Sequence, residues 1–124
     1  MTLKQAQEIL NTDERILACH IIDEKGIFVS QAAAEGYTDQ LNSDRELAQK
    51  WGAWLAVLIG LVRQFDSTLS EVEYLVIARK RFTGLIMPLG QYAVAGIVLP
   101  KGANAHEIAE KVRARTTQRS NPPQ

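Results

Sequence analysis

The longest run of apolar residues is W-G-A-W-L-A-V-L-I-G-L-V at 51–62, inside a segment of helical periodicity at 44–65. At 100° per residue, this predicted helix separates its apolar side chains by size. The small residues Gly52, Ala56 and Gly60 fall on one side. We expect them to face a second helix, because two interior glycines cost about 1 kcal/mol each relative to alanine and a close approach would offset that cost. The opposite, bulky side, which we expect to cover a core, comprises Leu47, Trp51, Trp54, Leu55, Leu58, Leu61, Val62 and Phe65.

Capping boxes mark the starts of two helices. Thr2 followed by Gln5 predicts a short first helix over residues 3–10. The sequence S-D-R-E at 43–46 predicts the start of the long helix, which would extend about 33 Å at 1.5 Å per residue. The alternative is a long helix buried on all sides within one larger core, for which a chain of this size has little room.

A β-hairpin is expected between these two helices. Residues 15–22 and 27–32 are rich in apolar and β-branched side chains and predict two strands. The connection D-E-K-G is short, and Gly26 can supply the positive φ that such a turn requires.

After the long helix the period changes from helical to extended. Residues 72–79, 82–87 and 91–99 predict three consecutive strands with tight connections, which favours an antiparallel meander. Asn104 can then cap a final amphipathic helix that ends near residue 115.

The order of predicted elements is α-β-β-α-β-β-β-α, which indicates an α/β (α+β) fold with one five-stranded antiparallel sheet. We expect the long helix on one face of the sheet and the terminal helices on the other. Residues 1–115 form a single domain in this interpretation. Residues 116–124, which lack an apolar anchor, are expected to be a disordered tail.

The composition of the chain argues against several classes of protein. The chain has 124 residues, 46% of them hydrophobic, and equal numbers of acidic and basic side chains, so no overall field favours nucleic acid. The start of the chain lacks the pattern of a secretory signal, and the apolar run at 51–62 is too short to span a bilayer. The lone Cys19 fits a reducing compartment, and we expect a cytoplasmic protein.

The sequence contains no pattern that predicts catalysis. Cys19 and His20 are neighbours in a strand and would point to opposite faces, and His106 is distant. Asp23 and Glu24 lie in a solvated turn. Neither a metal-ligand spacing nor a glycine-rich phosphate loop is present, so we expect a non-enzymatic protein without cofactor or metal.

Arg79, Lys80 and Arg81 form a cationic hairpin turn. Such a turn could contact an acidic protein surface or a phosphate, or act as an arginine finger. Charged hairpin tips also serve as solubilising features, and both interpretations stay open.

Four segments, taken in order, resemble the roadblock/dynein light chain family. The segment at 16–29 resembles the first hairpin of that family, and the segment at 44–55 resembles the start of its long helix. The segments at 83–99 and 103–113 resemble its last two strands and its closing helix. The match extends over nearly the whole chain, and its specificity lies in the order and spacing of the segments.

The resemblance implies a profilin-like domain that forms a dimer. Two long helices would pack antiparallel, and the strand after the helix would pair with its copy to give one ten-stranded sheet. Together with the small side of the helix, this predicts a symmetric interface. Its expected residues are Gly52, Ala56, Gly60, Val72, Tyr74 and Val76.

The function that the resemblance implies is that of a homodimeric scaffold or regulator. The expected partner is a small Ras-like GTPase or an assembly that it controls, and the turn at 79–81 is a candidate contact. Regulation would act by positioning residues of the GTPase, without catalytic side chains from this chain. The alternative is a profilin-like sensor domain that binds a small molecule between sheet and helix.

Overall fold

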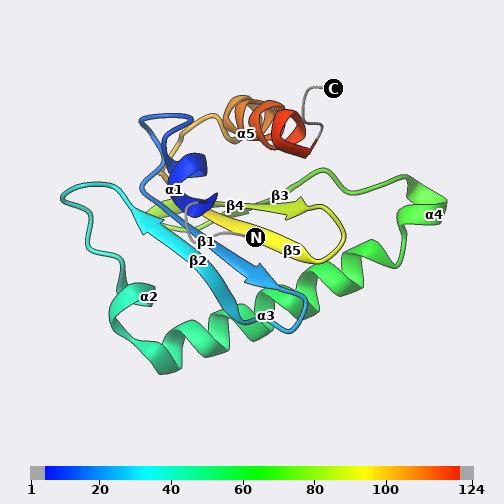
Figure 1. The fold of residues 1–124 in the computed structure, drawn as a ribbon, viewed down its shortest axis with the longest axis horizontal. Helices are drawn as coiled ribbons and strands as arrows, with labels where there is room; N and C mark the ends of the chain where they lie inside the picture. The colour runs from blue at the N-terminus through cyan, green and yellow to red at the C-terminus, as the bar shows by residue number, and fades with distance from the viewer. Residues whose placement is uncertain (1–4, 121–124) are drawn as a thin grey trace.

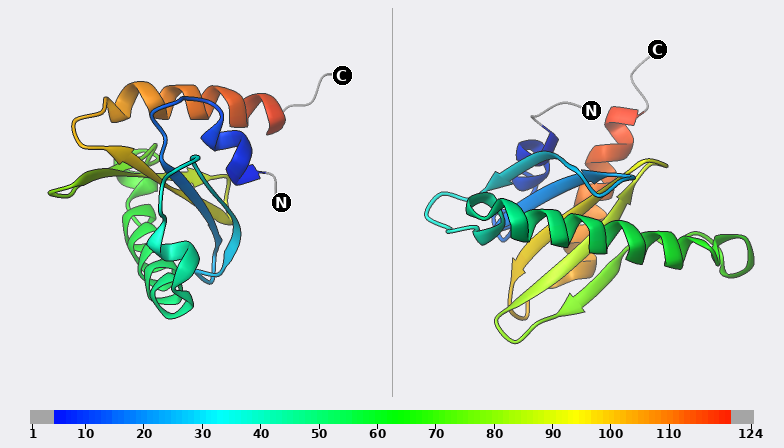
Figure 2. Two further views of the ribbon diagram at one scale, coloured as in Figure 1. Left: turned by 90° about the vertical axis from the view of Figure 1, so that its left-hand side faces the viewer. Right: turned by 90° about the horizontal axis from the view of Figure 1, so that it is seen from below.

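The computed structural model describes residues 5–120 and has three layers (Figures 1 and 2). A five-stranded antiparallel sheet has the order β2-β1-β5-β4-β3. The long helix α3 crosses one face, and α1 and α5 cover the other (Figure 2). The α+β fold and the placement of the helices are therefore as the sequence predicts.

The elements have the following bounds. The strands are β1 (Ala18–Asp23), β2 (Phe28–Ala33), β3 (Leu75–Ala78), β4 (Phe82–Leu89) and β5 (Ala93–Pro100). The helices are α1 (Gln5–Leu10), α2 (Gln40–Ser43), α3 (Arg45–Arg63), α4 (Asp66–Leu69) and α5 (Ala105–Ser120).

Several boundaries follow from local chemistry. Asp44 caps α3 by accepting the Leu47 N–H at 3.0 Å. Asn104 caps α5, as predicted, by accepting the Glu107 N–H at 3.1 Å. Gly26 has the positive φ, 85°, that the β1–β2 turn requires.

Some elements differ from the prediction. The sequence does not predict the short helices α2 and α4, because a single turn leaves no periodic apolar pattern. Strand β3 is only four residues long, although its extended pattern starts at Val72. Helix α5 continues past the predicted end near residue 115 to Ser120, so the prediction of a disordered tail at 116–124 is wrong for residues 116–120. The capping box at Thr2 and the tail residues 121–124 lie outside the described residues.

Both faces of the sheet are buried. The face toward α1 and α5 holds the larger cluster, in which Ile9 and Ile108 pack over Ile21, Leu85 and other side chains of the sheet. On the opposite face, Leu55 and Ile59 of α3 pack over sheet residues that include Ile22, Ile86 and Val94. Two covered faces explain the nearly continuous apolar strands.

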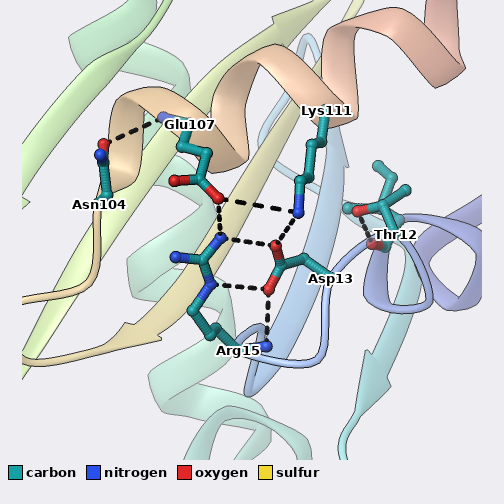
Figure 3. A network of polar contacts seen from close by, with 7 residues as sticks. Thr12, Asp13, Arg15, Asn104, Glu107 and Lys111 are labelled. Carbon is teal, nitrogen blue, oxygen red and sulfur yellow. Dashed lines mark hydrogen bonds and ion pairs between the residues drawn. The ribbon is translucent and has the colours of Figure 1, made fainter.

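A polar network fastens α5 to the segment before β1 (Figure 3). The buried Asp13 carboxylate accepts hydrogen bonds from Arg15 at 2.8–2.9 Å and from the Lys111 ammonium group at 2.9 Å. Arg15 also donates to Glu107 at 2.7 Å. The Arg15 hydrogen bonds lower the pKa of Asp13 well below its usual range, and Lys111 adds to this although burial opposes it.

Within the described residues, none of the helices has the combination of length and apolarity that a transmembrane helix requires.

Candidate interaction surface

Strand β3 forms one end of the sheet and has an unpaired edge within the described chain. It pairs only with β4, and Val76 is 48% exposed. The Arg79 N–H donates to the Phe82 carbonyl at 2.9 Å, so odd-numbered residues of this strand direct their backbone groups toward β4. Val76 and Ala78 therefore present their N–H and C=O groups at the free edge. Such an edge is a template for another strand.

One flank of α3, continued by Phe65 just past the end of the helix, carries large apolar side chains that the described chain leaves largely uncovered. Leu47, Trp54, Leu61 and Phe65 are 40–58% exposed, and we call them the exposed flank. The prediction that the whole bulky side covers a core is wrong for these four residues. Only Leu55 and Ile59 reach the centre of the sheet as buried large residues, and Trp51, Leu58 and Val62 are half-buried.

The opposite, small flank of α3 begins against the β1–β2 turn of the same chain. A Cβ on Gly52 would lie 2.1 Å from the carbonyl oxygen of Gly26, so two glycines allow the helix and the turn to approach closely. This corrects the role predicted for Gly52: its close approach is to its own hairpin. Ala56 is half-buried, and Gly60 is exposed with no atom within 4 Å of a Cβ built on it.

A groove of about 580 Å³ lies between the first half of α3, the segment at 37–41 and the sheet, where residues of β1, β5, β4 and β3 line it. Leu47 and Trp51 line it from α3, and Ile77 and Gly84 line it from the sheet. Arg79 and Arg81 also line it. The groove thus extends from Leu47, the one residue of the exposed flank that lines it, to Ile77 of the edge strand.

A buried polar pair also borders this groove. His20 Nε2 of β1 and Asp39 Oδ2 lie 2.5 Å apart, and both residues are at least nine-tenths buried. The other oxygen of Asp39 accepts the Leu41 N–H at 3.1 Å and caps α2. The sequence analysis missed Asp39, whose only local signal is its position before a helix too short for a periodic pattern.

Cys19 is not available to this pair. Cys19 packs in the core under α1 and α5, on the opposite face of the sheet from His20. Burial raises the pKa of the Cys19 thiol to about 12, so the thiolate is scarce at neutral pH. Asp23 accepts the N–H groups of Lys25 and Ile27 and stabilises the β1–β2 turn. No group of histidine, cysteine and carboxylate side chains within residues 5–120 could hold a metal ion.

The predicted interface residues before β3 are fastened within the chain. The Tyr74 hydroxyl is hydrogen-bonded to His106 Nδ1 of α5 at 2.6 Å. The Val72 N–H donates to Asp66 Oδ1 at 3.3 Å, and the Val72 side chain is half-buried. These contacts hold the segment before β3 in place at the sheet edge.

The cationic turn projects from the body of the protein. Arg79, Lys80 and Arg81 are exposed, and their side chains form no hydrogen bond or ion pair with any described residue. The turn itself is fastened through its backbone, because Lys101 donates to the Arg79 carbonyl at 2.7 Å. Its three positive charges are therefore available to a partner.

Solved roadblock-type structures share this fold. A Roadblock/LC7 domain from Streptomyces avermitilis superimposes with a TM-score of 0.70 at 11% identity, covering 95% of this chain and 94% of that chain. Gliding protein MglB from Thermus thermophilus gives 0.69 at 13% identity, with 91% and 81% covered. MglB from Myxococcus xanthus gives 0.70 at 8% identity, with 95% and 90% covered.

No family model matches the sequence, and no curated protein matches it significantly. The structural likeness confirms, at the level of the fold, the resemblance to roadblock domains that the sequence indicates. A further similar structure is of MglB in a tetrameric arrangement, with a TM-score of 0.69 at 14% identity, so self-association occurs in one structural neighbour.

Proposed function

We propose that this protein is a non-enzymatic homodimeric scaffold or regulator that acts on a small Ras-like GTPase or on an assembly that such a GTPase controls. The observation that carries the proposal is the surface formed by the exposed flank of α3, the groove and the edge of β3. Large apolar side chains next to an unpaired strand edge are typical of a protein–protein interface. The buried Cys19, which has no second cysteine to pair with, fits a reducing cytoplasm.

The spacing of the exposed flank supports a second copy as the occupant of this surface. Leu47 and Leu61 each lie seven residues, about two helical turns, from Trp54. An antiparallel copy of α3 centred on Trp54 would therefore bring Leu47 of one helix opposite Leu61 of the other. A twofold interface requires such self-complementarity.

The proposed interface retains part of the predicted set. Val76 lies at the free edge, and Val72 and Tyr74 precede it in the same segment. Ala56 and Gly60 lie on the small flank of α3 and remain candidates for a contact with a partner rather than with the twin helix. Gly52 is removed from the proposed interface, because the β1–β2 turn of the same chain packs against it.

The GTPase partner comes from the resemblance to the roadblock family. A dimer without catalytic groups would accelerate or restrain hydrolysis by holding the switch segments of the GTPase in one arrangement. The buried Cys19 thiol and the inward-facing His20–Asp39 pair support a role in which this chain supplies a surface and no reacting side chain.

The homodimer is tested by Trp54→Asp, which places a charge at the centre of the exposed flank. We expect wild-type protein to sediment as a dimer and the variant to sediment as a folded monomer, because Trp54 is 46% exposed and its ring contact within the chain is with the half-buried Trp51. Ile27→Asp is the matched control, since Ile27 is 57% exposed at the β1–β2 turn. A Trp54→Asp variant that dimerises as tightly as wild type would exclude this flank from the interface.

The GTPase role is tested by hydrolysis and binding assays with small Ras-like GTPases from the same cell. We expect the dimer to bind one of them and to change its hydrolysis rate, and we expect monomeric Trp54→Asp to lose this effect. Absence of binding to every such GTPase would contradict the regulatory role while leaving the dimer intact.

A small-molecule sensor is the second candidate, and the groove is the observation that favours it. Its volume of about 580 Å³ suits a small ligand. Native mass spectrometry of the purified protein distinguishes the two functions: the scaffold gives the mass of a bare dimer, and the sensor gives an additional bound mass.

A further inference from the structure

Two strand glycines in the floor of the groove differ in what lies over them. Gly84 of β4 and Gly96 of β5 both line the groove. A Cβ on Gly96 would lie 3.4 Å from Leu55 Cδ1, so side chains of α3 fill the space above it. Apart from its own chain neighbours, a Cβ on Gly84 would have only Ile77 of the adjacent strand within 4 Å among the described residues. The space above Gly84 is therefore open.

Packing within the described chain does not explain the glycine at position 84. A glycine inside a strand weakens it and often marks the close approach of another backbone or of a ligand. The approach of α3 accounts for Gly96, but no described residue accounts for Gly84. Ile77 and Val98, which pair with Gly84 on either side, are half-buried. The right-hand view of Figure 2 shows this end of β3, β4 and β5 projecting beyond α3, so the helix borders this apolar floor without covering it.

The groove has its fixed positive charges on the side of β3. Arg79 and Arg81 are the lysine or arginine side chains that line it within residues 5–120. Both are exposed, and neither forms a side-chain hydrogen bond or ion pair with a described residue. On the side of β1, the charged carboxyl group is that of Asp39, whose two oxygens are engaged by His20 and by the Leu41 N–H. A bound anion is therefore attracted to the arginine side.

We propose that the groove binds a small molecule that has an apolar body and one carboxylate. Arg79 and Arg81 hold the carboxylate, and the apolar body lies over Gly84, against Leu47 and Trp51 of α3. The groove volume of about 580 Å³ is typical of sites for small ligands. This inference rests on the sensor function, the second candidate above, and names its ligand class. It does not depend on the homodimer.

A carboxylate matches the arginine side of the groove better than a phosphate does. One guanidinium donates two parallel hydrogen bonds to the two oxygens of a carboxylate. A phosphate has a further oxygen and is commonly held by the N–H groups at the start of a helix. Arg79 and Arg81 lie on the connection between two strands, where no described helix begins. Their side chains are therefore suited to a carboxylate.

Isothermal titration calorimetry of the full chain with octanoate, 1-octanol and octyl phosphate tests the proposal. The three probes share an apolar chain and differ in the head group. We expect octanoate to bind about tenfold or more tightly than 1-octanol, because only the carboxylate forms charge-assisted hydrogen bonds with the arginines. Octyl phosphate should bind no more tightly than octanoate. Raising the salt concentration should reduce the preference for octanoate, because the arginines are exposed and screened.

Variants of the cationic turn test the contact with the head group. The double variant R79Q/R81Q should bind octanoate no more tightly than 1-octanol, because it has lost both guanidinium groups. Lys80→Gln is the matched control, since Lys80 is an exposed cation of the same turn that does not line the groove. This control should keep nearly the wild-type dissociation constant for octanoate.

Variants of Gly84 test the position of the apolar body. Gly84→Leu should abolish the binding of octanoate and of 1-octanol, because the new side chain occupies the open space above the sheet. Gly84→Ala is the control and should retain binding, because its Cβ meets Ile77 at ordinary contact distances of 3.6 and 3.7 Å. Circular dichroism confirms that each variant is folded. In NMR spectra of the wild-type chain, octanoate should shift the Gly84 amide resonance and leave that of Gly26, at the β1–β2 turn, unchanged.

The results that overturn the proposal differ in what else they remove. Wild-type protein that does not bind octanoate, or binds it no more tightly than 1-octanol, overturns the recognition of a carboxylate. Tighter binding of octyl phosphate overturns the choice of head group. Undiminished octanoate binding by R79Q/R81Q, or by folded Gly84→Leu, overturns the location of the site.

Two further measurements separate this proposal from the proposed functions. Native mass spectrometry that shows another molecule bound to a protein without affinity for octanoate overturns the ligand class and keeps the sensor. Sedimentation of the same samples reports on the homodimer independently. A monomeric chain that binds octanoate as expected retains the ligand site and contradicts only the homodimer.

Discussion

Asp13 is the buried charge on which the attachment of α5 depends. Its side chain is 3% exposed, while those of its partners Arg15 and Lys111 are one-third to one-half exposed. A buried carboxylate is tolerated because it is fully hydrogen-bonded. The sequence indicates only a helix end near this residue, since the partner from α5 lies 98 positions away along the chain.

Replacing Asp13 by Asn should destabilise the protein by about 1–2 kcal/mol at pH 7, a value reduced for the exposure of its partners. The pKa of Asp13 is lowered on folding, so its contribution is complete above the unfolded pKa of about 4 and declines as the pH falls below it. Urea unfolding at several pH values measures this. Equal stability of the two proteins at pH 7 would contradict the prediction.

The hydrogen-bond partner of His20 could not be predicted from the sequence. Strand alternation places Cys19 and His20 on opposite faces, as expected, and makes their separation predictable. The partner of His20 is Asp39, which comes from an irregular segment without periodicity. The His20–Asp39 contact arises from the tertiary fold of this segment, so no local sequence pattern indicates it.

At the level of elements, α3 shows both what the pattern determines and what it leaves open. Asp44 and the apolar period give the start and the length of the helix correctly within two residues at each end. The helical period also separates large from small side chains around α3, but it does not indicate which side of the helix faces the sheet. In the structure the Gly52 side of α3 lies against Gly26, a contact between positions far apart along the chain that no local pattern indicates.

The two interior glycines of α3 should respond oppositely to substitution by alanine. Gly52→Ala should destabilise the protein by about 1–3 kcal/mol, because a Cβ there overlaps the Gly26 carbonyl and separates helix from turn. Gly60→Ala should stabilise the monomer by up to about 1 kcal/mol, because its site is open and alanine favours helix. Thermal unfolding compares them. Equal effects would contradict the packing of α3 against the hairpin.

At the scale of the whole molecule, exposed apolar side chains gather along α3, and Val76 adds one at the edge strand β3. Periodicity and turn chemistry could predict the order of strands and the layers, because these follow from local patterns and short connections. The groove could not be predicted, because it exists only where α3 leaves the β3–β4 part of the sheet uncovered. The backbone groups at the free edge of β3 are the ones that the proposed pairing of two copies would change.

Hydrogen exchange at the Val76 and Ala78 amides, measured by NMR as protein concentration is raised, tests the pairing of two copies most directly. Both N–H groups face the free edge in the single chain and should exchange readily when the protein is dilute. Pairing of β3 with its copy should slow their exchange by about tenfold or more at high concentration, while the Ile77 amide, already directed toward β4, changes little. Exchange of Val76 and Ala78 that stays fast in a demonstrated dimer would contradict the account.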